Sequence, residues 1–230
     1  MATLIVGARC KDGVVLVADR KQASRLTFEL GMSTSKLVTV GPLVMGYCGT
    51  RAPLDKVRRL LGTRLQDVNS LDAALDLAES VATELQESYK ELLGEEHLQF
   101  PLAGLERLTS GKAHLYTITA GFAPDEVHYG GWGIGERYSE LGKLFFDAEQ
   151  PVDEVSKVLP LLVALAERIS LAIGDGLDVV IVRDEAGPKF LQNGETQVLL
   201  EKARNFVKDL KGIAEGRLLH TWVAKGEKSV

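Results

Sequence analysis

The sequence has few cysteines, no long apolar run and no excess of positive charge, and each lack excludes a class of protein. Its two cysteines, Cys10 and Cys48, are too few for a disulfide framework, so a reducing compartment is expected. The longest apolar run, residues 158–166, is about half as long as a membrane-spanning helix. No stretch has the layout of a secretory signal. We therefore expect a soluble, cytoplasmic protein with no membrane partner.

The charge balance argues against a nucleic-acid-binding protein. A net charge of -5 and an isoelectric point near 5.5 leave no basic stripe for a phosphate backbone. The histidines have no metal-binding spacing, so no metal site is predicted. A length of 230 residues fits one sizeable domain, and no repeat or linker marks a boundary, so residues 1–230 are expected to form a single domain.

Hydrophobic periodicity predicts strands in blocks and helices in pairs. The expected strands cover residues 3–10, 14–19, 36–41, 43–49, 113–121 and 125–133, with a further strand pair within 177–192. The expected helices cover residues 54–66, 71–93, 136–147, 152–172 (kinked or divided at Pro160) and 195–214. Residues 95–112 fit either a strand and loop or an insertion. This order indicates an α+β fold, a four-layer αββα sandwich of two antiparallel sheets between helix pairs.

The first two strands form a hairpin whose loop length decides which side chains share a face. A three-residue loop, 11–13, pairs Cys10 with Val14 and puts a glycine at the left-handed position that this loop requires. In that register Thr3 and Asp19 face the same space, about 7–8 Å apart at the backbone. A two-residue turn at Asp12-Gly13 would point Asp19 away from Thr3. The three-residue loop therefore predicts a hydroxyl and a carboxylate near each other.

The segment TLIVGARCKDGVVLVADRK resembles the first hairpin of proteasome β-type subunits, which are N-terminal-nucleophile hydrolases with an αββα sandwich. The matching positions are Thr3, Gly7, Lys11-Asp12-Gly13, Asp19, Arg20, then Lys36 before the next strand, and Gly49 in YCGTRAPLDKVRRLL. AHLYTITAGFAPDEVHYGGWGIG and GDGLDVVIV resemble later strands of the family. The resemblance covers about residues 1–210.

This resemblance implies a threonine peptidase with four catalytic positions. Thr3 would be the nucleophile and, through a free α-amine, its own base, because such an amine has a pKa of about 7.7–8.0. Lys36 would activate the hydroxyl electrostatically, Asp19 would keep that lysine charged and oriented, and Gly49 would donate its N–H to the oxyanion.

The resemblance also implies the substrate and the partners. Lys21, Gln22 and Met45 fall where the family's substrate-pocket residues lie. The substrate would be a peptide or an unfolded protein, and the chain would assemble into a homo-oligomeric ring or join other proteasome-like subunits. This chemistry needs no cofactor and no metal.

Several positions depart from the active pattern and leave other functions open. Met1-Ala2 precede Thr3, so both residues must be removed before the threonine amine is free. Ile134, Ser170 and Ile173 stand where active members of the family have a serine, an aspartate and a serine. The alternatives are a non-catalytic structural or assembly subunit, and a transpeptidase or amidase on the same fold.

Overall fold

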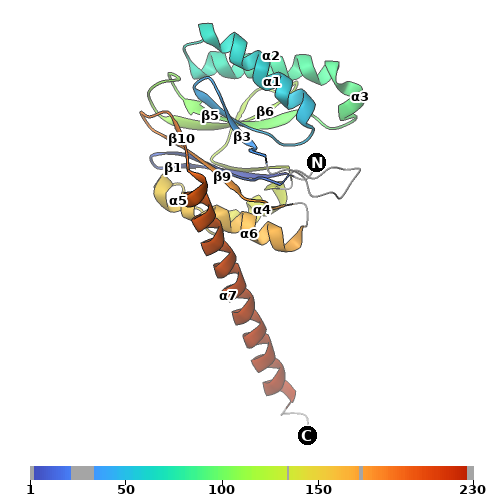
Figure 1. The fold of residues 1–230 in the computed structure, drawn as a ribbon, viewed down its shortest axis with the longest axis vertical. Helices are drawn as coiled ribbons and strands as arrows, with labels where there is room; N and C mark the ends of the chain where they lie inside the picture. Colours follow the sequence, from blue (N-terminus) through green and yellow to red (C-terminus); the bar gives the residue numbers. More distant parts are fainter. Residues whose placement is uncertain (1–2, 22–33, 134, 171–172, 227–230) are drawn as a thin grey trace.

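The fold is that of a computed structural model, which describes residues 3–21, 34–133, 135–170 and 173–226. Two five-stranded antiparallel sheets lie face to face, and helices cover the outer face of each (Figure 1). The predicted α+β fold, a four-layer αββα sandwich, is therefore confirmed.

The first sheet contains the N-terminal hairpin at its centre and has the strand order β10-β9-β2-β1-β8. Its strands are β1 (Leu4–Cys10), β2 (Gly13–Asp19), β8 (Tyr129–Gly133), β9 (Leu177–Arg183) and β10 (Pro188–Phe190). Its helices are α4 (Gly135–Gly142), α5 (Val152–Val158), α6 (Pro160–Ile169) and α7 (Asn193–Gly226).

The second sheet has the order β3-β4-β5-β6-β7. Its strands are β3 (Leu37–Val40), β4 (Leu43–Gly46), β5 (Gln99–Leu105), β6 (Ala113–Thr119) and β7 (Asp125–Glu126). Its helices are α1 (Arg51–Arg64), the single turn η1 (Leu65–Asp67), α2 (Leu71–Ser88) and α3 (Lys90–Leu93). Ser70 caps α2, its Oγ accepting the N–H of Ala73 at 3.4 Å.

Strand alternation divides the core into three layers. Leu4 and Val6 of β1 pack toward the helices of the first sheet, while Ile5 packs into the layer between the two sheets. In that middle layer Trp132 of β8 donates its indole N–H to Thr117 Oγ1 of β6 at 3.1 Å. This hydrogen bond joins the two sheets directly.

The hairpin register differs from the prediction. Cys10 pairs with Gly13 and Ile5 pairs with Ala18, so the loop contains only two residues, Lys11 and Asp12. The predicted three-residue loop is therefore wrong. Because a shift of one residue exchanges the two faces of a strand, Asp19 does not share the face of Ile5.

Contacts from distant parts of the chain explain the shorter loop. The Asp12 carboxylate accepts the backbone N–H of Val152 at 2.8 Å and a guanidinium N–H of Arg183 at 3.1 Å. Gly13 lies against β9, where a Cβ would come within 2.4 Å of the carbonyl oxygen of Val182. The glycine is required for this close approach between strands and does not serve as a left-handed turn residue.

Two predicted elements are divided in the structure. Residues 125–133 form two strands, β7 in the second sheet and β8 in the first, so the chain crosses between the sheets here. Pro160 separates α5 from α6, as predicted. The helix predicted over 136–147 ends earlier, at Gly142.

Two other segments settle questions that the sequence left open. Residues 95–112 contain β5, the central strand of the second sheet, which is the strand-and-loop alternative. The last helix, α7, continues beyond the predicted end at 214 to Gly226 and projects away from both sheets (Figure 1). Within the described part of the chain, no helix is long and apolar enough to cross a membrane.

Candidate active site

A buried ion pair lies at the end of the N-terminal hairpin. Lys36, which directly precedes β3, donates from Nζ to Oδ1 of Asp19, the last residue of β2, at 2.6 Å. The Lys36 side chain is 7% exposed and the Asp19 side chain is fully buried. A pair that is withdrawn from water in this way needs further hydrogen bonds to offset the loss of hydration.

Asp19 obtains those hydrogen bonds from three backbone N–H groups. Leu4 donates to Oδ1 at 2.8 Å, and Lys21 and Gly174 donate to Oδ2 at 3.1 and 3.4 Å. The carboxylate therefore joins the start of β1, the end of β2 and the loop before β9. Since Leu4 follows Thr3 directly, the ion pair lies beside the threonine.

A second buried carboxylate positions the lysine backbone. Asp178 of β9 accepts the N–H of Lys36 on Oδ2 at 2.9 Å and the Nε–H of Arg20 on Oδ1 at 2.6 Å. Sequence reasoning missed Asp178, although an aspartate inside the apolar strand LDVVIVR was a usable signal. It holds β2, β9 and the segment before β3 together.

Burial is the main influence on both charges of the ion pair. Loss of hydration lowers the pKa of the Lys36 ammonium, and the nearby carboxylates of Asp19, Asp178 and Asp175 oppose this change. Burial likewise raises the pKa of the Asp19 carboxyl, and the charge and hydrogen bond of Lys36, with the backbone hydrogen bonds of Leu4 and Gly174, oppose it. The hydrogen bonds therefore offset part of the cost of burying the charges.

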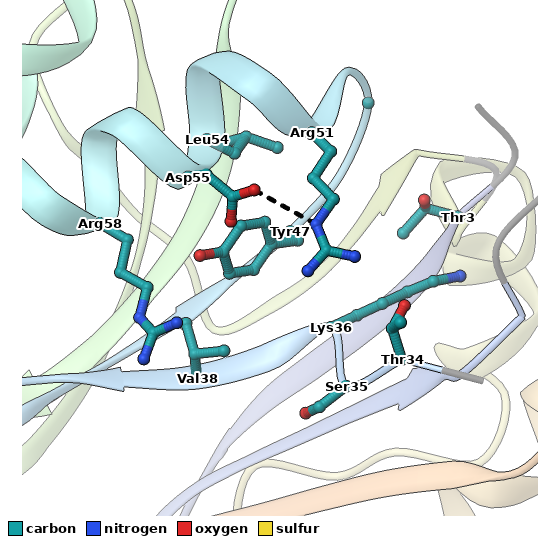
Figure 2. A pocket seen from close by; sticks show the side chains of 11 residues that line it. Thr3, Thr34, Ser35, Lys36, Val38, Tyr47, Arg51, Leu54, Asp55 and Arg58 are labelled. Atoms are coloured by element: carbon teal, nitrogen blue, oxygen red, sulfur yellow. Dashed lines mark hydrogen bonds and ion pairs between the residues drawn. The ribbon is translucent and has the colours of Figure 1, made fainter. Parts of the chain in front are cut away.

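A cavity of about 320 Å³ opens next to this pair. Thr3 and Lys36 both line it, and Figure 2 shows the Lys36 side chain extending toward Thr3. Gly49 lines it as well, between β4 and α1, with a left-handed φ of +90° that favours glycine. The other lining residues are Thr34, Ser35, Val38, Tyr47, Arg51, Leu54, Asp55 and Arg58.

The structure thus brings the four predicted catalytic positions together. Thr3, Lys36 and Gly49 share the cavity, and Asp19 lies behind Lys36. The predicted three-residue loop placed Thr3 and Asp19 on one strand face, and this reason for their proximity is wrong. They lie close because Asp19 binds the Leu4 amide, and not because they share a strand face.

The three predicted substrate positions have separate locations. Met45 is fully buried in the core between the second sheet and its helices, and it is not among the described residues that line the cavity. Lys21 is half-buried beside Asp19, and it is not among the described residues that line the cavity. Gln22 lies outside the described residues.

Sequence reasoning missed the charged wall of the cavity. Arg51, Asp55 and Arg58 all belong to α1, at spacings of four and three residues, which put them on one helix face. This spacing was a usable signal, but a polar helix face is usually only solvated. What distinguishes this face is its position over the cavity (Figure 2).

Two of the positions that depart from the active pattern lie between α6 and β9. Ile173 is buried in the core beneath the first sheet, and Ser170 caps the C-terminal end of α6. Ile134 lies outside the described residues. Among the residues that the structure describes, no group of three histidine, cysteine or acidic side chains could hold a metal ion.

Solved structures of known proteins share this fold. Anbu (ancestral beta-subunit) from Yersinia bercovieri superposes with a TM-score of 0.75 at 17% identity over 93% of this chain and 97% of that one. A Gly-1 mutant of Anbu from Hyphomicrobium sp. strain MC1 gives 0.75 at 16% identity, over 94% and 97%. The helical assembly of the Anbu complex from Pseudomonas aeruginosa gives 0.76 at 18% identity, over 93% and 96%.

The sequence comparisons identify a family and no individual relative among curated proteins. A search of curated proteins found no match. The family model described as proteasome subunit matches residues 1–182, which include both sheets except β10 and the last residue of β9. This match covers well over half of the 230 residues. The chain therefore belongs to the proteasome subunit family.

Proposed function

We propose that this protein is a threonine-type peptidase that cleaves peptide bonds through Thr3 once Met1-Ala2 have been removed. The observation that carries the proposal is the buried Lys36–Asp19 ion pair beside Thr3, at 2.6 Å. A strand end with only a structural role does not require a buried ammonium near a hydroxyl. The Lys36 ammonium would stabilise negative charge that develops on the threonine oxygen during a reaction.

In the first half of the reaction, Thr3 Oγ1 attacks the carbonyl carbon of the scissile peptide bond. The free α-amine of Thr3 takes the hydroxyl proton, and the nearby Lys36 ammonium stabilises negative charge on the attacking oxygen. The Gly49 N–H donates to the oxyanion. The tetrahedral intermediate then breaks the C–N bond, and the departing amine takes the proton from the α-ammonium.

In the second half, a water molecule attacks the ester that links the substrate acyl group to Thr3 Oγ1. The α-amine takes a proton from this water, and the ester C–O bond breaks. The proton returns to Oγ1, which restores threonine and releases the new carboxylate. Asp19 takes no proton in this cycle, because its role is to hold Lys36 charged and oriented.

Processing of the N-terminus follows the same chemistry. Attack of Thr3 Oγ1 on the Ala2 carbonyl carbon transfers the Met1-Ala2 acyl group from nitrogen to oxygen. That transfer breaks the C–N bond, and the Thr3 nitrogen takes the hydroxyl proton and becomes the free α-amine. Hydrolysis of the ester by water then releases the dipeptide and restores the Thr3 hydroxyl. Lys36 is expected to assist this step as well.

The test is the intact mass and N-terminal sequence of purified wild type and Lys36→Ala, with Lys143→Ala as control. Lys143 is an exposed lysine that pairs with Glu140 on α4, far from the site in sequence. We expect the wild type and Lys143→Ala to begin at Thr3 and to cleave peptides and an unfolded protein, whereas Lys36→Ala keeps Ala2. A wild type that keeps Ala2 and cleaves nothing contradicts the proposal.

A second candidate function is a non-catalytic assembly subunit. It is supported by the Ala2–Thr3 peptide bond and by the isoleucine at position 173, where active members have a serine. In that case Lys36 and Asp19 would serve stability alone. Retention of Ala2 in all three proteins would favour it.

We also propose that copies of this chain assemble with one another in the cytoplasm. One structurally similar protein, from Pseudomonas aeruginosa, is described as a helical assembly of the Anbu complex. Mass photometry of the purified protein tests this proposal. A single species with the mass of one chain, 25.0 kDa, at all concentrations would contradict it.

A further inference from the structure

The cavity beside Thr3 is where a substrate side chain would lie, if the proposed function is correct. Thr3 and Gly49 both line it, so a carbonyl held between them carries its own side chain into this space. The volume of about 320 Å³ lies at the lower end of the range for ligand pockets, roughly 300–1,000 Å³. The side chains of the cavity therefore select the residue whose carbonyl is attacked.

The inner walls of the cavity are apolar. Leu54 is fully buried, and Val38 and Tyr47 are half-buried. Burial raises the pKa of the Tyr47 hydroxyl, the neighbouring Asp55 adds to the rise and the neighbouring Arg58 opposes it, so this phenol stays uncharged at neutral pH. These apolar walls would contact the methylene groups of a substrate side chain. The charged residues of the cavity would then determine which terminal group binds.

The charged wall carries more positive than negative charge. Among the described lining residues, Arg51 and Arg58 contribute two guanidiniums and Asp55 one carboxylate. Arg51 Nε donates to Asp55 Oδ2 at 3.2 Å, which offsets one of the two positive charges. The remaining cation of the cavity, Lys36, is already balanced by Asp19. With Asp19 counted, the side-chain charges of the described lining residues therefore sum to one positive charge.

The start of α1 adds to this positive potential. The helix begins at Arg51, next to the cavity, so its N-terminal end carries the positive partial charge of the helix dipole. Its first turn, Arg51–Leu54, contains no acidic residue that could offset this charge. An anionic group in the cavity would gain from both the dipole and the guanidiniums.

We propose that this cavity selects an acidic side chain, glutamate or aspartate, at the substrate residue whose carbonyl Thr3 attacks, with Arg51 and Arg58 binding the carboxylate. Guanidiniums bind carboxylates through charge-assisted, often bidentate hydrogen bonds. Figure 2 shows both arginine side chains extending from α1 toward the strand that carries Val38, on either side of Tyr47. A lysine side chain in the same place would meet a wall whose described residues carry two positive charges and one negative charge.

The first experiment compares cleavage of peptides that differ only at this residue: glutamate, its neutral isostere glutamine, leucine and lysine. We expect kcat/KM for glutamate to exceed that for glutamine by about tenfold. Arg51→Met and Arg58→Met, which keep an apolar stem, should each lower this ratio, and the double variant should bring it to parity. Arg59→Met is the matched control, since Arg59 is on the same helix but is not among the described residues lining the cavity.

The second experiment does not depend on catalysis. Calorimetry or NMR titration measures binding of acetylated tripeptide amides that end in glutamate, glutamine or leucine, with wild type and with the double arginine variant. We expect the glutamate peptide to bind most tightly to the wild type, and this advantage to fall with added salt and in the double variant.

The two experiments separate this inference from the proposed function. Cleavage with no preference for glutamate overturns the inference and leaves the peptidase proposal standing. Selective binding of the glutamate peptide without cleavage supports the inference and counts against the peptidase. Equal binding of the glutamate and glutamine peptides, or no binding of either at millimolar concentration, overturns the inference.

Discussion

Lys36 Nζ lies 2.6 Å from Asp19 Oδ1 in a part of the protein that water barely reaches, and the two residues are 17 positions apart in the sequence. The same carboxylate oxygen accepts the N–H of Leu4 at 2.8 Å. One buried group therefore connects a charged side chain with the backbone next to Thr3. The backbone next to Thr3 is therefore held in place by Asp19.

The ion pair should be strongly coupled in stability. Lys36→Met leaves the Asp19 carboxylate buried without its counter-charge, so the free energy of unfolding should fall by about 3–5 kcal/mol. The double variant Lys36→Met/Asp19→Asn should lose less than the sum of the single losses, because it holds no unbalanced charge. Urea unfolding of the four proteins measures this coupling. Strictly additive losses would contradict it.

Gly13 should tolerate a side chain less well than Gly41. A Cβ at Gly13 would lie 2.4 Å from the Val182 carbonyl oxygen, whereas a Cβ at Gly41, with a φ of +58°, meets nothing within 4 Å. We expect Gly13→Ala to lower the free energy of unfolding by about 3 kcal/mol and Gly41→Ala by about 1 kcal/mol. Thermal unfolding compares them, and equal losses would show that the contact between β2 and β9 can relax.

The hydrogen bond between the sheets should be sensitive to loss of its acceptor. Thr117→Val removes the oxygen that accepts the Trp132 indole N–H at 3.1 Å and leaves that buried donor unsatisfied. The expected loss is about 1–3 kcal/mol, while Thr117→Ser keeps a hydroxyl and should lose less. Chemical unfolding followed by circular dichroism distinguishes them. The hydrogen bond is unimportant if the valine and serine variants are equally stable.

Alkaline pH should destabilise the protein through its buried thiols. Burial raises the pKa of Cys48 from 9.0 to about 12, and its Sγ donates to the Gln99 carbonyl at 2.8 Å. Because the folded state holds this proton more tightly than the unfolded state, the contribution is complete below pH 9 and is lost as pH rises toward 12. The slope is at most about 1.4 kcal/mol per pH unit for one thiol.

Urea unfolding of wild type and Cys48→Ala between pH 8 and pH 11 measures this effect. The variant lacks the thiol and should lose less stability with rising pH, so the difference between the two proteins should shrink. Cys10 provides a second case, since burial also raises its pKa to about 12. A difference that stays constant across this range would show that Cys48 does not titrate with unfolding.

Much of the fold could be predicted because local patterns carry it. The alternating apolar residues of β1 and β2, the cap at Ser70 and the break at Pro160 all depend on neighbours within a few positions. Pairing of strands into hairpins and of helices into layers then follows from burial of apolar faces. The candidate site was predicted from the resemblance of the segments that contain Thr3, Asp19 and Lys36 to proteasome β-type subunits.

The details that the prediction missed depend on residues far apart in the chain. The hairpin loop is set by the bonds of Asp12 to Val152 and Arg183, which lie 140 and 171 positions away. The break in residues 125–133 arises because β7 pairs with β6 while β8 pairs with β1. Neither pairing leaves a periodic signal within the segment itself.

The sequence by itself determined the α+β layers, the antiparallel sheets and the order of the residues at the candidate site. Only the tertiary structure decided the hairpin register, the burial of Met45 and the cavity that Arg51, Asp55 and Arg58 share with Thr3. The physical reason is that periodicity reports which face of an element avoids water. It does not report which distant group will meet that face.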